Sequence, residues 1–289
     1  MENQTITIIC GATATGKSSY AFNLAKQFNQ ANILSADSRQ FYKHLPIVSG
    51  QDKKADIPSN VALFGQGILN PDQVSNIGDF KKYADKVIKT SQIENKKLII
   101  VGGSGLYLKA ITENLANTTV LPDPVFRQEA QNLSVESLQN ILRKINPKLF
   151  NSLNNSDINN PRRLIRHIEI SKHPNSQSTI YNLPSTISYQ WVGLKKSPEN
   201  LLQSIKDRVI QRLKNGAIDE VKMLLKNYPN TSLPIYTTLG VKQILSFINK
   251  EISKAELVDL WTIADKNYAK RQNVWFKKQP SIVWYDSNI

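Results

Sequence analysis

Short apolar, β-branched segments alternate with helical patterns in the first hundred residues. Segments 5–10, 31–35 and 97–101 have the pattern of buried strands, and Ala21 and Ala25 follow the first of them at helical spacing. Strands that alternate with helices predict a parallel, doubly wound α/β sheet. Each segment ends in a polar or glycine-rich loop, and such sheets bind their ligands at the carboxyl ends of the strands. We therefore expect a site at that edge.

The pattern changes after Leu121, where helical periodicity with asparagine-rich breaks replaces the alternation. We therefore expect a helical insertion subdomain at about 121–189, within an α/β core made of residues 1–120 and about 190–289. Two further strands are predicted in the second part of this core, at 188–194 and 282–285. Helical patterns dominate the sequence between these two strands.

The first strand leads into a loop with the phosphate-binding spacing G-x-x-x-x-G-K-[ST], and a helical pattern follows it. The loop consists of Gly11, Ala12, Thr13, Ala14, Thr15, Gly16, Lys17 and Ser18. Its glycines let backbone amides wrap an anion, the helix N-terminus adds a positive dipole end, and Lys17 neutralises phosphate charge. Ser18 would bind Mg²⁺. The flanking strand and helix argue against a chance glycine-lysine turn, so we expect a P-loop NTPase-like sheet.

This loop indicates a diphosphate or triphosphate ligand but leaves the reaction open, because kinases, GTPases and diphosphate-releasing transferases all use it. A GTPase is disfavoured. The Asn-Lys-x-Asp signature that reads the guanine base has no good counterpart, since Asn95-Lys96-Lys97 is followed by Leu98. The other motifs of the chain must therefore identify the reaction.

Positive charge is the one unusual feature of the composition. The chain has 37 lysines and arginines against 23 acidic residues, which gives a net charge of +14 and a pI of about 9.7. The excess is larger in residues 151–289, where 20 basic side chains face 11 acidic ones. This balance favours a polyanionic partner such as a nucleic acid, and the second half is the better candidate for contact. Lysines that only keep the protein soluble are the alternative.

No apolar segment approaches the roughly 18 residues of a membrane span, and the N-terminal residues lack the pattern of a signal peptide. We therefore expect a cytoplasmic protein without a membrane partner. A monomer is expected as well, although the sequence itself carries no signal for the oligomeric state. The single cysteine, Cys10, lies in a strand pattern and is expected to be buried. The three histidines have no metal-ligand spacing and receive no catalytic role.

Several further motifs occur in a fixed order along nearly the whole chain. They are Ser35-Ala36-Asp37-Ser38-Arg39-Gln40-Phe41-Tyr42, Val101-Gly102-Gly103-Ser104-Gly105-Leu106-Tyr107-Leu108, Asp123-Pro124 with Arg127, Asn160-Pro161-Arg162-Arg163-Leu164-Ile165-Arg166 and Tyr268-Ala269-Lys270-Arg271-Gln272-Asn273-Val274-Trp275-Phe276. With the phosphate loop, this ordered set closely resembles the tRNA dimethylallyltransferases, also called tRNA isopentenyltransferases.

The resemblance implies that a dimethylallyl group passes from dimethylallyl diphosphate to N6 of the adenosine 3′-adjacent to the anticodon of a tRNA. The products would be N6-isopentenyladenosine and diphosphate. It also implies a Mg²⁺ cofactor and recognition of the tRNA anticodon stem-loop. In this family the phosphate loop holds the diphosphate of the prenyl donor, although the same pattern is commonly taken for an ATP-binding motif.

The resemblance also assigns catalytic roles. Asp37, at a strand end, would be the base that accepts a proton from the adenine amine, since a positioned base assists such a weak nucleophile. A capping or Mg²⁺-organising aspartate is the alternative. Lys17, Ser18 with Mg²⁺, and Arg208 would stabilise the leaving diphosphate. Without the resemblance, Arg208 fits an exposed helix salt bridge. Ser104 would lie near the reacting groups or cap a helix.

The target base lies in an anticodon loop, so the enzyme has to extrude it and fill its place. The residues expected to contact tRNA are Asp37, Ser38, Arg39, Gln40, Ser104, Arg127, Arg162, Arg163, Leu164, Ile165 and Arg166. Arg162 and Arg166 are four residues apart, on one face of a helix whose apolar side faces the protein. A solvated basic face without a partner is the alternative.

The chain departs from the family pattern at 61–67, where a histidine-rich stretch is usual, and at Val241, where the family has tyrosine. These departures put details of RNA contact in doubt. Trp275 and Phe276 are expected to anchor the last helix in the core rather than to meet RNA. Two other classes of function stay open. One is another enzyme, either a small-molecule kinase or a prenyltransferase for free adenine nucleotides, and the other is a non-catalytic RNA-binding protein with a nucleotide switch.

Overall fold

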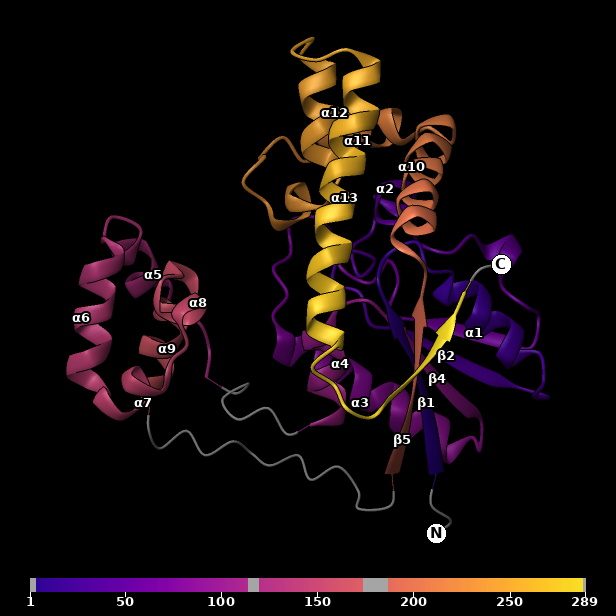
Figure 1. Ribbon diagram of the computed structural model, residues 1–289, viewed down its shortest axis with the longest axis horizontal. Coiled ribbons are helices and arrows are strands. Elements are labelled where there is room, and N and C mark those ends of the chain that lie inside the picture. The colour runs from indigo at the N-terminus through magenta and orange to yellow at the C-terminus, as the bar shows by residue number, and fades with distance from the viewer. Residues whose placement is uncertain (1–3, 114–119, 174–186, 288–289) are drawn as a thin grey trace. The chain divides into compact units, whose positions relative to one another are not determined.

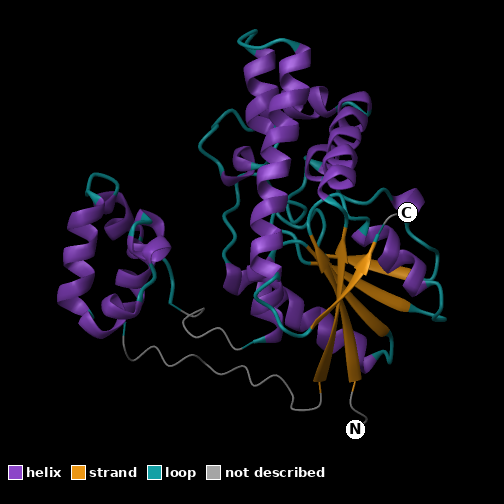
Figure 2. Ribbon diagram, viewed as in Figure 1, coloured by secondary structure: helices purple, strands orange, loops and turns teal. Residues whose placement is uncertain are grey.

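The computed structural model describes residues 4–113, 120–173 and 187–287 (Figures 1 and 2). The chain divides into two compact units. The larger unit combines residues 1–113 with 184–289, and the smaller unit contains residues 114–183. The smaller unit is therefore an insertion in the sequence of the larger one.

Parallel strands form a six-stranded sheet in the larger unit, in the order β3-β2-β4-β1-β5-β6. The strands are β1 (Gln4–Gly11), β2 (Ala31–Ser35), β3 (Val61–Phe64), β4 (Lys97–Gly102), β5 (Ile187–Lys195) and β6 (Ile282–Asp286). Ile9 of β1 lies opposite Val101 of β4 and Val192 of β5. Since all strands run in one direction, their carboxyl ends meet at one edge of the sheet.

Helices cover both faces of this sheet (Figure 2). Consecutive residues of the inner strands pack in different hydrophobic cores on opposite faces of the sheet, because side chains alternate in direction along a strand. Ile8 and Ile100 pack with α3 (Ile77–Ile93) and α4 (Gly105–Thr112). Their neighbours Ile9 and Ile99 pack on the other face with α1, which spans Lys17–Ala25. The central strands are thus buried on both sides, as their continuous apolar sequences require.

The helices between β5 and β6 form a third core around the fully buried Trp261. They are α10 (Pro198–Lys214), α11 (Ala217–Asn227), η2 (Pro234–Thr237), α12 (Val241–Ile248) and α13 (Lys254–Phe276), joined by α2 (Pro46–Ser49) from the loop that also holds η1 (Lys54–Asp56). Phe276, about 22 Å further along α13 at 1.5 Å per residue, packs in a sheet core. This one helix therefore links the helical core to the sheet (Figure 1).

Short helices build the smaller unit. They are α5 (Pro124–Ala130), α6 (Val135–Ile145), α7 (Pro147–Ser152), α8 (Asn155–Ile158) and α9 (Pro161–Ser171). Leu138 and Leu142 of α6 pack against Leu164 and Ile168 of α9 in their own core. Each helix begins after an Asp, Ser or Asn residue whose side chain accepts backbone N–H hydrogen bonds. The asparagine-rich breaks of the sequence are therefore helix N-caps.

The structure confirms the predicted parallel α/β sheet, and each of the five predicted strands agrees with an observed strand to within one residue at either end. Strand β3 was missed, because it is a short edge strand whose residues are only partly buried or exposed. The described helices of the smaller unit fall within the expected insertion. Residues 174–186, near its predicted end, lie outside the described residues.

Two other expectations concern single features of the larger unit. Cys10 is buried in β1, and burial raises the pKa of its thiol to about 12, so the thiol is protonated at neutral pH. Phe276 is fully buried and Trp275 packs against the same core, as expected for anchors of the last helix. Within the described ranges, no helix is both long and apolar enough to cross a lipid bilayer.

Candidate active site at the phosphate loop

The phosphate loop leaves β1 through a glycine that no other residue could replace without strain. Gly11 has a φ of 138°, and a Cβ there would lie 2.3 Å from the carbonyl oxygen of Leu194. At the other end, Gly16 adopts a left-handed conformation before α1. Inside the loop, the Thr15 hydroxyl and the Lys17 ammonium donate to the Ala12 carbonyl at 2.9 and 2.5 Å.

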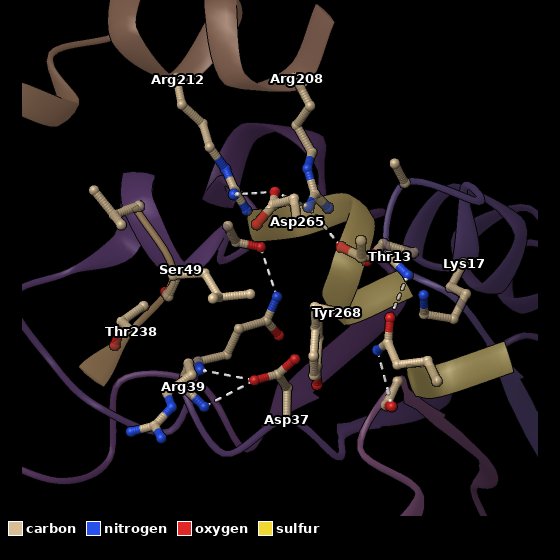
Figure 3. Close-up of a pocket in the computed structure, with 18 of the residues that line it drawn as sticks. Thr13, Lys17, Asp37, Arg39, Ser49, Arg208, Arg212, Thr238, Asp265 and Tyr268 are labelled. Carbon is tan, nitrogen blue, oxygen red and sulfur yellow. Dashed lines mark hydrogen bonds and ion pairs between the residues drawn. The ribbon is translucent and has the colours of Figure 1, made fainter. Parts of the chain in front are cut away.

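A cavity of about 560 Å³ opens beside this loop at the carboxyl edge of the sheet (Figure 3). The loop after β2 contributes Asp37, Ser38, Arg39 and Gln40 to its lining. Basic side chains outnumber acidic ones there: Lys17, Arg39, Lys196, Arg208, Arg212 and Arg271 against Asp37 and Asp265. The cavity therefore attracts anions, and its volume suits a small organic ligand.

Two arginines from α10 share one carboxylate of α13 (Figure 3). Nη2 of Arg208 lies 3.0 Å from Oδ2 of Asp265, and Nη1 of Arg212 lies 3.8 Å from the same oxygen. Arg208 also donates to the Thr13 hydroxyl at 2.5 Å, so it reaches the phosphate loop. Arg208 therefore forms an ion pair between two helices at the phosphate loop. The alternative interpretation, an exposed helix salt bridge, does not describe this contact.

The charge of these cations is only partly compensated. Burial, with Arg208 second, lowers the pKa of Lys17 from 10.5 to about 8. Burial and Arg208 also lower the pKa of Arg212, whose guanidinium nevertheless stays charged at pH 7. The buried Nε of Arg208 has no hydrogen-bond partner among the described residues. An anion bound in the cavity would offset the free-energy cost of burying these positive charges.

Gln272 of α13 holds the phosphate loop and the loop after β4 together. Its Oε1 accepts the backbone N–H of Thr13 at 2.8 Å, and its Nε2 donates to the Gly103 carbonyl at 2.9 Å. A Cβ at Gly103 would lie 2.2 Å from Nε2 of Gln272, so a larger residue there would displace this side chain from its position between the two loops. The last helix therefore fixes the positions of two loops that begin on adjacent strands.

Asp37 lines the cavity with one carboxylate oxygen already engaged. Its Oδ1 accepts the backbone N–H groups of Arg39 at 2.8 Å and Gln40 at 3.4 Å, which orients the carboxylate across its own turn. The other oxygen, Oδ2, accepts no hydrogen bond from the described residues. Arg39 donates to the Pro234 carbonyl at 2.9 Å. Asp37 thus caps a turn, as the alternative interpretation stated, and still presents a free oxygen to the cavity.

Ser18 and Asp52 meet beneath the loop. The Ser18 hydroxyl lies 3.3 Å from Oδ2 of Asp52, and Nε2 of Gln66 donates to the same oxygen at 2.7 Å. Burial raises the pKa of the Asp52 carboxyl, while Gln66 and Ser18 act in the opposite direction. Gln66 belongs to segment 61–67, so the departure from the family pattern there supplies a partner for Asp52.

Ser104 is the N-cap residue of α4, but its side chain makes no capping hydrogen bond. It instead hydrogen bonds with Tyr268 of α13, which lines the cavity (Figure 3). Burial, with the Asp37 charge second, raises the pKa of Tyr268 to about 12, and the bond to Ser104 opposes the rise. Tyr268 is therefore a neutral side chain that can donate a hydrogen bond in the cavity.

Oxygen ligands for a metal ion are sparse. No cluster of three or more His, Cys, Asp or Glu side chains that could hold a metal occurs in the described part of the chain. Mg²⁺ sites that serve phosphate ligands typically need only one or two protein oxygens, because water and the phosphates supply the rest. The Ser18 hydroxyl at the start of α1 fits this limited requirement.

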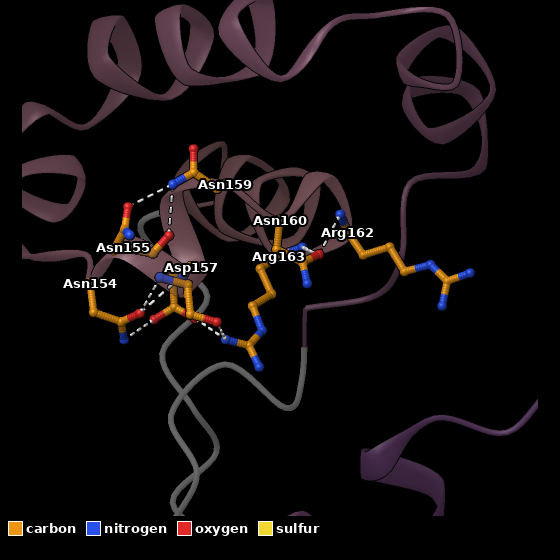
Figure 4. Close-up of polar contacts among 8 residues, drawn as sticks. Asn154, Asn155, Asp157, Asn159, Asn160, Arg162 and Arg163 are labelled. Carbon is orange, nitrogen blue, oxygen red and sulfur yellow. Dashed lines mark hydrogen bonds and ion pairs between the residues drawn. The ribbon is translucent and has the colours of Figure 1, made fainter. Parts of the chain in front are cut away.

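The predicted tRNA-contacting arginines of the smaller unit have different environments. Glu169 is fully buried and pairs with Arg127 at 2.6 Å and with Arg166 at 3.1 Å. Arg163 pairs with Asp157 at 2.5 Å (Figure 4). Arg162 is exposed and projects away from these contacts (Figure 4), without a side-chain partner within the described ranges. Arg162 therefore has the most freely available charge of the four.

Leu164 requires a correction. It was expected among the tRNA-contacting residues, but its side chain is fully buried in the core of the smaller unit. A side chain without exposed surface cannot contact RNA, so Leu164 is a core residue. Its neighbour Ile165 is partly buried against the same core.

Sequence reasoning missed Asp52, Arg212 and Asp265, and gave Gln272 no role. A signal existed for Arg212, which follows Arg208 by four residues and so shares its helix face. Gln272 lay inside a motif already recognised, but an uncharged side chain in a helix gives no signal that it joins two loops. Asp52 and Asp265 gave no local signal, because only the fold brings them to the phosphate loop and to Arg208.

Comparisons with known proteins find similarity along nearly the whole chain. A sequence model of the family described as IPP transferase matches residues 40–279. The chain is 32% identical over 280 residues to a tRNA dimethylallyltransferase of Picosynechococcus, covering 97% of this chain and 93% of the relative. It is also 32% identical over 296 residues to a tRNA dimethylallyltransferase of Halothermothrix orenii, with coverage of 99% and 88%.

Solved structures are similar as well. The tRNA isopentenylpyrophosphate transferase of Bacillus halodurans has a TM-score of 0.71 and 26% identity, covering 99% of this chain and 90% of that protein. A eukaryotic dimethylallyltransferase shares the fold with a TM-score of 0.80 at 23% identity, covering 98% of this chain and 74% of that protein.

Lys17 generates a prediction about stability and pH. Its folded-state pKa is lowered, so the unfolded chain binds more protons between pH 8 and 10.5 and this group makes stability rise with pH across that window. Lys17→Met removes the cost of burying the charge. We expect the variant to be more stable than the wild type at pH 7, by on the order of 1–3 kcal/mol, with a smaller difference at pH 10.

Urea unfolding at the two pH values measures this difference in the absence of phosphate ligands. Lys26→Met, at the exposed end of α1, is the matched control and should show little change at either pH. A Lys17→Met variant less stable than the wild type at pH 7 would show that the Lys17 ammonium contributes net stability to the empty loop.

Proposed function

The chain belongs to the IPP transferase family, and on that premise we propose that it transfers a dimethylallyl group from dimethylallyl diphosphate to tRNA. The acceptor in this proposal is N6 of the adenosine 3′-adjacent to the anticodon. The observation that carries the proposal is the common lining of one cavity by Lys17, Arg208 and Asp37 (Figure 3). Two cations for a diphosphate thus accompany a carboxylate with a free oxygen.

The phosphate loop and α10 would bind the donor. Loop amides, Lys17 and the guanidinium of Arg208 surround the space beside Thr13, so a diphosphate bound there would contact both cations. The diphosphate leaves with the electron pair of the allylic carbon–oxygen bond. Fixed cations that lie where this negative charge develops stabilise the transition state, because they need no reorganisation during the reaction.

Asp37 would act on the acceptor. As the N6 nitrogen forms its bond to the allylic carbon, it loses one proton, and Oδ2 of Asp37 is the free oxygen that can accept it. The hydrogen bonds from Arg39 and Gln40 to Oδ1 hold the carboxylate in one orientation. Such a positioned base contributes typically 10²–10⁴-fold to the rate.

Mg²⁺ is the proposed cofactor, with the Ser18 hydroxyl as one ligand. When bound, the ion would neutralise charge on the diphosphate and so improve it as a leaving group. The protein residues then keep their separate tasks: Lys17 and Arg208 bind the diphosphate, Gln272 fixes the loop, and Asp37 receives the proton.

tRNA contact is proposed for both units. Ser38, Arg39 and Gln40 follow the proposed base in the cavity wall, where an extruded adenosine would be surrounded. In the smaller unit, the exposed Arg162 offers a charge for the phosphate backbone, and Arg127, Arg163 and Arg166 add charge while paired within the protein. We place this activity in the cytoplasm. A monomer is enough for it in this proposal, because a single unit of the chain supplies all of the cavity residues.

The transfer reaction itself provides the first test. Purified protein, Mg²⁺ and labelled dimethylallyl diphosphate are incubated with unmodified tRNA or with AMP, and nucleosides are identified by mass. We expect label in N6-isopentenyladenosine from tRNA. Label only in AMP would favour the free-nucleotide enzyme, and RNA binding without any product would favour the nucleotide switch.

Asp37→Asn keeps the oxygen that caps the turn and removes the base. We expect turnover with tRNA to fall by about 10²–10⁴-fold, because proton acceptance is lost. Binding of tRNA and of pyrophosphate should stay close to wild type, which separates this effect from misfolding. Unchanged turnover would remove Asp37 from the role of base.

Arg162→Ala tests the smaller unit. We expect weaker tRNA binding and a decrease of about 1 in the slope of log affinity against log salt concentration, as for the loss of one phosphate contact. Pyrophosphate binding should not change. Lys148→Ala removes the same charge from an exposed position of α7 in the same unit and is the control. Equal effects of both variants would indicate net charge rather than a specific contact.

A further inference from the structure

Asp52 occupies a position that the proposed reaction leaves without a task. It follows α2 in the loop between β2 and β3, and the fold carries it beneath the phosphate loop. Both side-chain hydrogen-bond partners of Asp52 in the described ranges, Ser18 and Gln66, are uncharged. A carboxylate held by neutral partners next to a phosphate loop needs a physical explanation, since it would repel the very ligand that the loop attracts.

A small cavity of about 50 Å³ lies beside Asp52, and the charge of its lining differs from that of the large cavity. Its charged lining residues are Lys17, Asp37 and Asp52, so carboxylates outnumber cations there. In the large cavity the basic side chains are in excess. A small cation therefore has a favourable location on the Asp52 side of the loop, whereas the diphosphate has one on the Arg208 side.

The spacing of the oxygens also suits a metal ion. Mg²⁺ binds oxygen at about 2.0–2.1 Å in octahedral geometry, so two adjacent ligand oxygens are about 3 Å apart. The Ser18 hydroxyl oxygen and Oδ2 of Asp52 are 3.3 Å apart. Both are hard oxygen donors of the kind that Mg²⁺ prefers, and one carboxylate beside a phosphate ligand is the usual protein share of such a site.

Gln66 holds Asp52 in this orientation through two reciprocal hydrogen bonds. Its Nε2 donates to Oδ2 of Asp52 at 2.7 Å, and its Oε1 accepts the backbone N–H of Asp52 at 3.0 Å. Nε2 of Gln66 also donates to the Gln40 side chain at 3.1 Å. Outer partners of this kind orient metal ligands and strengthen ion binding.

We propose that Asp52 and Ser18 are adjacent ligands of one divalent cation, which binds together with the diphosphate at the phosphate loop. This inference rests on the proposed function only in taking the ion as the one that accompanies the donor's diphosphate. In the absence of the ion, Asp52 repels the diphosphate. With the ion bound, Asp52 strengthens diphosphate binding, so the carboxylate makes the loop selective for a metal–diphosphate complex.

Binding measurements on Asp52→Asn test the proposal without tRNA or a prenyl group. Mn²⁺ binding is followed by electron paramagnetic resonance in the presence of inorganic pyrophosphate, and pyrophosphate binding by calorimetry with and without Mg²⁺. We expect Mn²⁺ affinity to fall at least about tenfold, the lower end of the loss seen when groups around a metal are removed. Pyrophosphate binding without metal should be equal to or tighter than that of the wild type, because a negative charge is gone.

Asp56→Asn is the matched control, since it removes the same charge from an exposed carboxylate in η1. Its metal and pyrophosphate affinities should equal those of the wild type. Asp52→Glu keeps the charge and should recover part of the Mn²⁺ affinity. In the double variant with Ser18→Ala, the losses should be less than additive, because both residues bind the same ion.

Two results would overturn the proposal. One is unchanged Mn²⁺ affinity in Asp52→Asn that retains a cooperative unfolding transition. The other is an equal loss of pyrophosphate affinity with and without metal, which would make Asp52 a residue that only shapes the loop. Neither result depends on dimethylallyl transfer, so failure of the proposed function and failure of this site are separately detected.

Discussion

Arg208 and Arg212 share a single carboxylate, Asp265, while the nearby Lys17 has a backbone carbonyl as its hydrogen-bond acceptor. Such an arrangement leaves positive charge uncompensated in a partly buried space, which disfavours the empty state of the cavity. The surrounding structure has to hold these groups in place nonetheless, and it does so with three packed cores. Folding has therefore already desolvated and oriented the cations that a diphosphate contacts when it binds. A site of this kind lowers the stability of the folded protein and favours binding of the ligand.

A series of hydrogen-bonded side chains, neutral except for Asp52, connects the two ends of the site. The Ser35 hydroxyl donates to Gln40 at 2.6 Å, Gln66 bridges Gln40 and Asp52, and Asp52 contacts Ser18. This series begins at the end of β2, next to the turn of Asp37, and ends at the phosphate loop. Because amide and hydroxyl groups carry no net charge, they fix relative positions without altering the electrostatic balance of the cavity. The positions of the proposed base and the proposed metal ligands are therefore coupled by structure rather than by charge.

Local signals in the sequence account well for one part of this architecture and poorly for another. Strands β1, β2 and β4 were predictable because their apolar runs are buried on both faces, and the phosphate loop because its glycines and lysine follow one another along the chain. Arg208 was found only through resemblance to a family, and its partner Asp265 was not found at all. The two residues are 57 positions apart on different helices, and no local sequence pattern records such a contact. The partial burial and exposure that hid β3 arise from its edge position, which is a property of the assembled sheet.

The contact of Gln272 with Thr13 joins positions 259 residues apart. A ribosome makes the phosphate loop long before α13, so the two cannot meet until Gln272 has been synthesised. A nascent chain can thus form its first strand and helix while the loop between them still lacks a side-chain acceptor for the Thr13 amide and the opposing contact to Gly103. The phosphate loop can therefore take the conformation described here only after Gln272 has been synthesised.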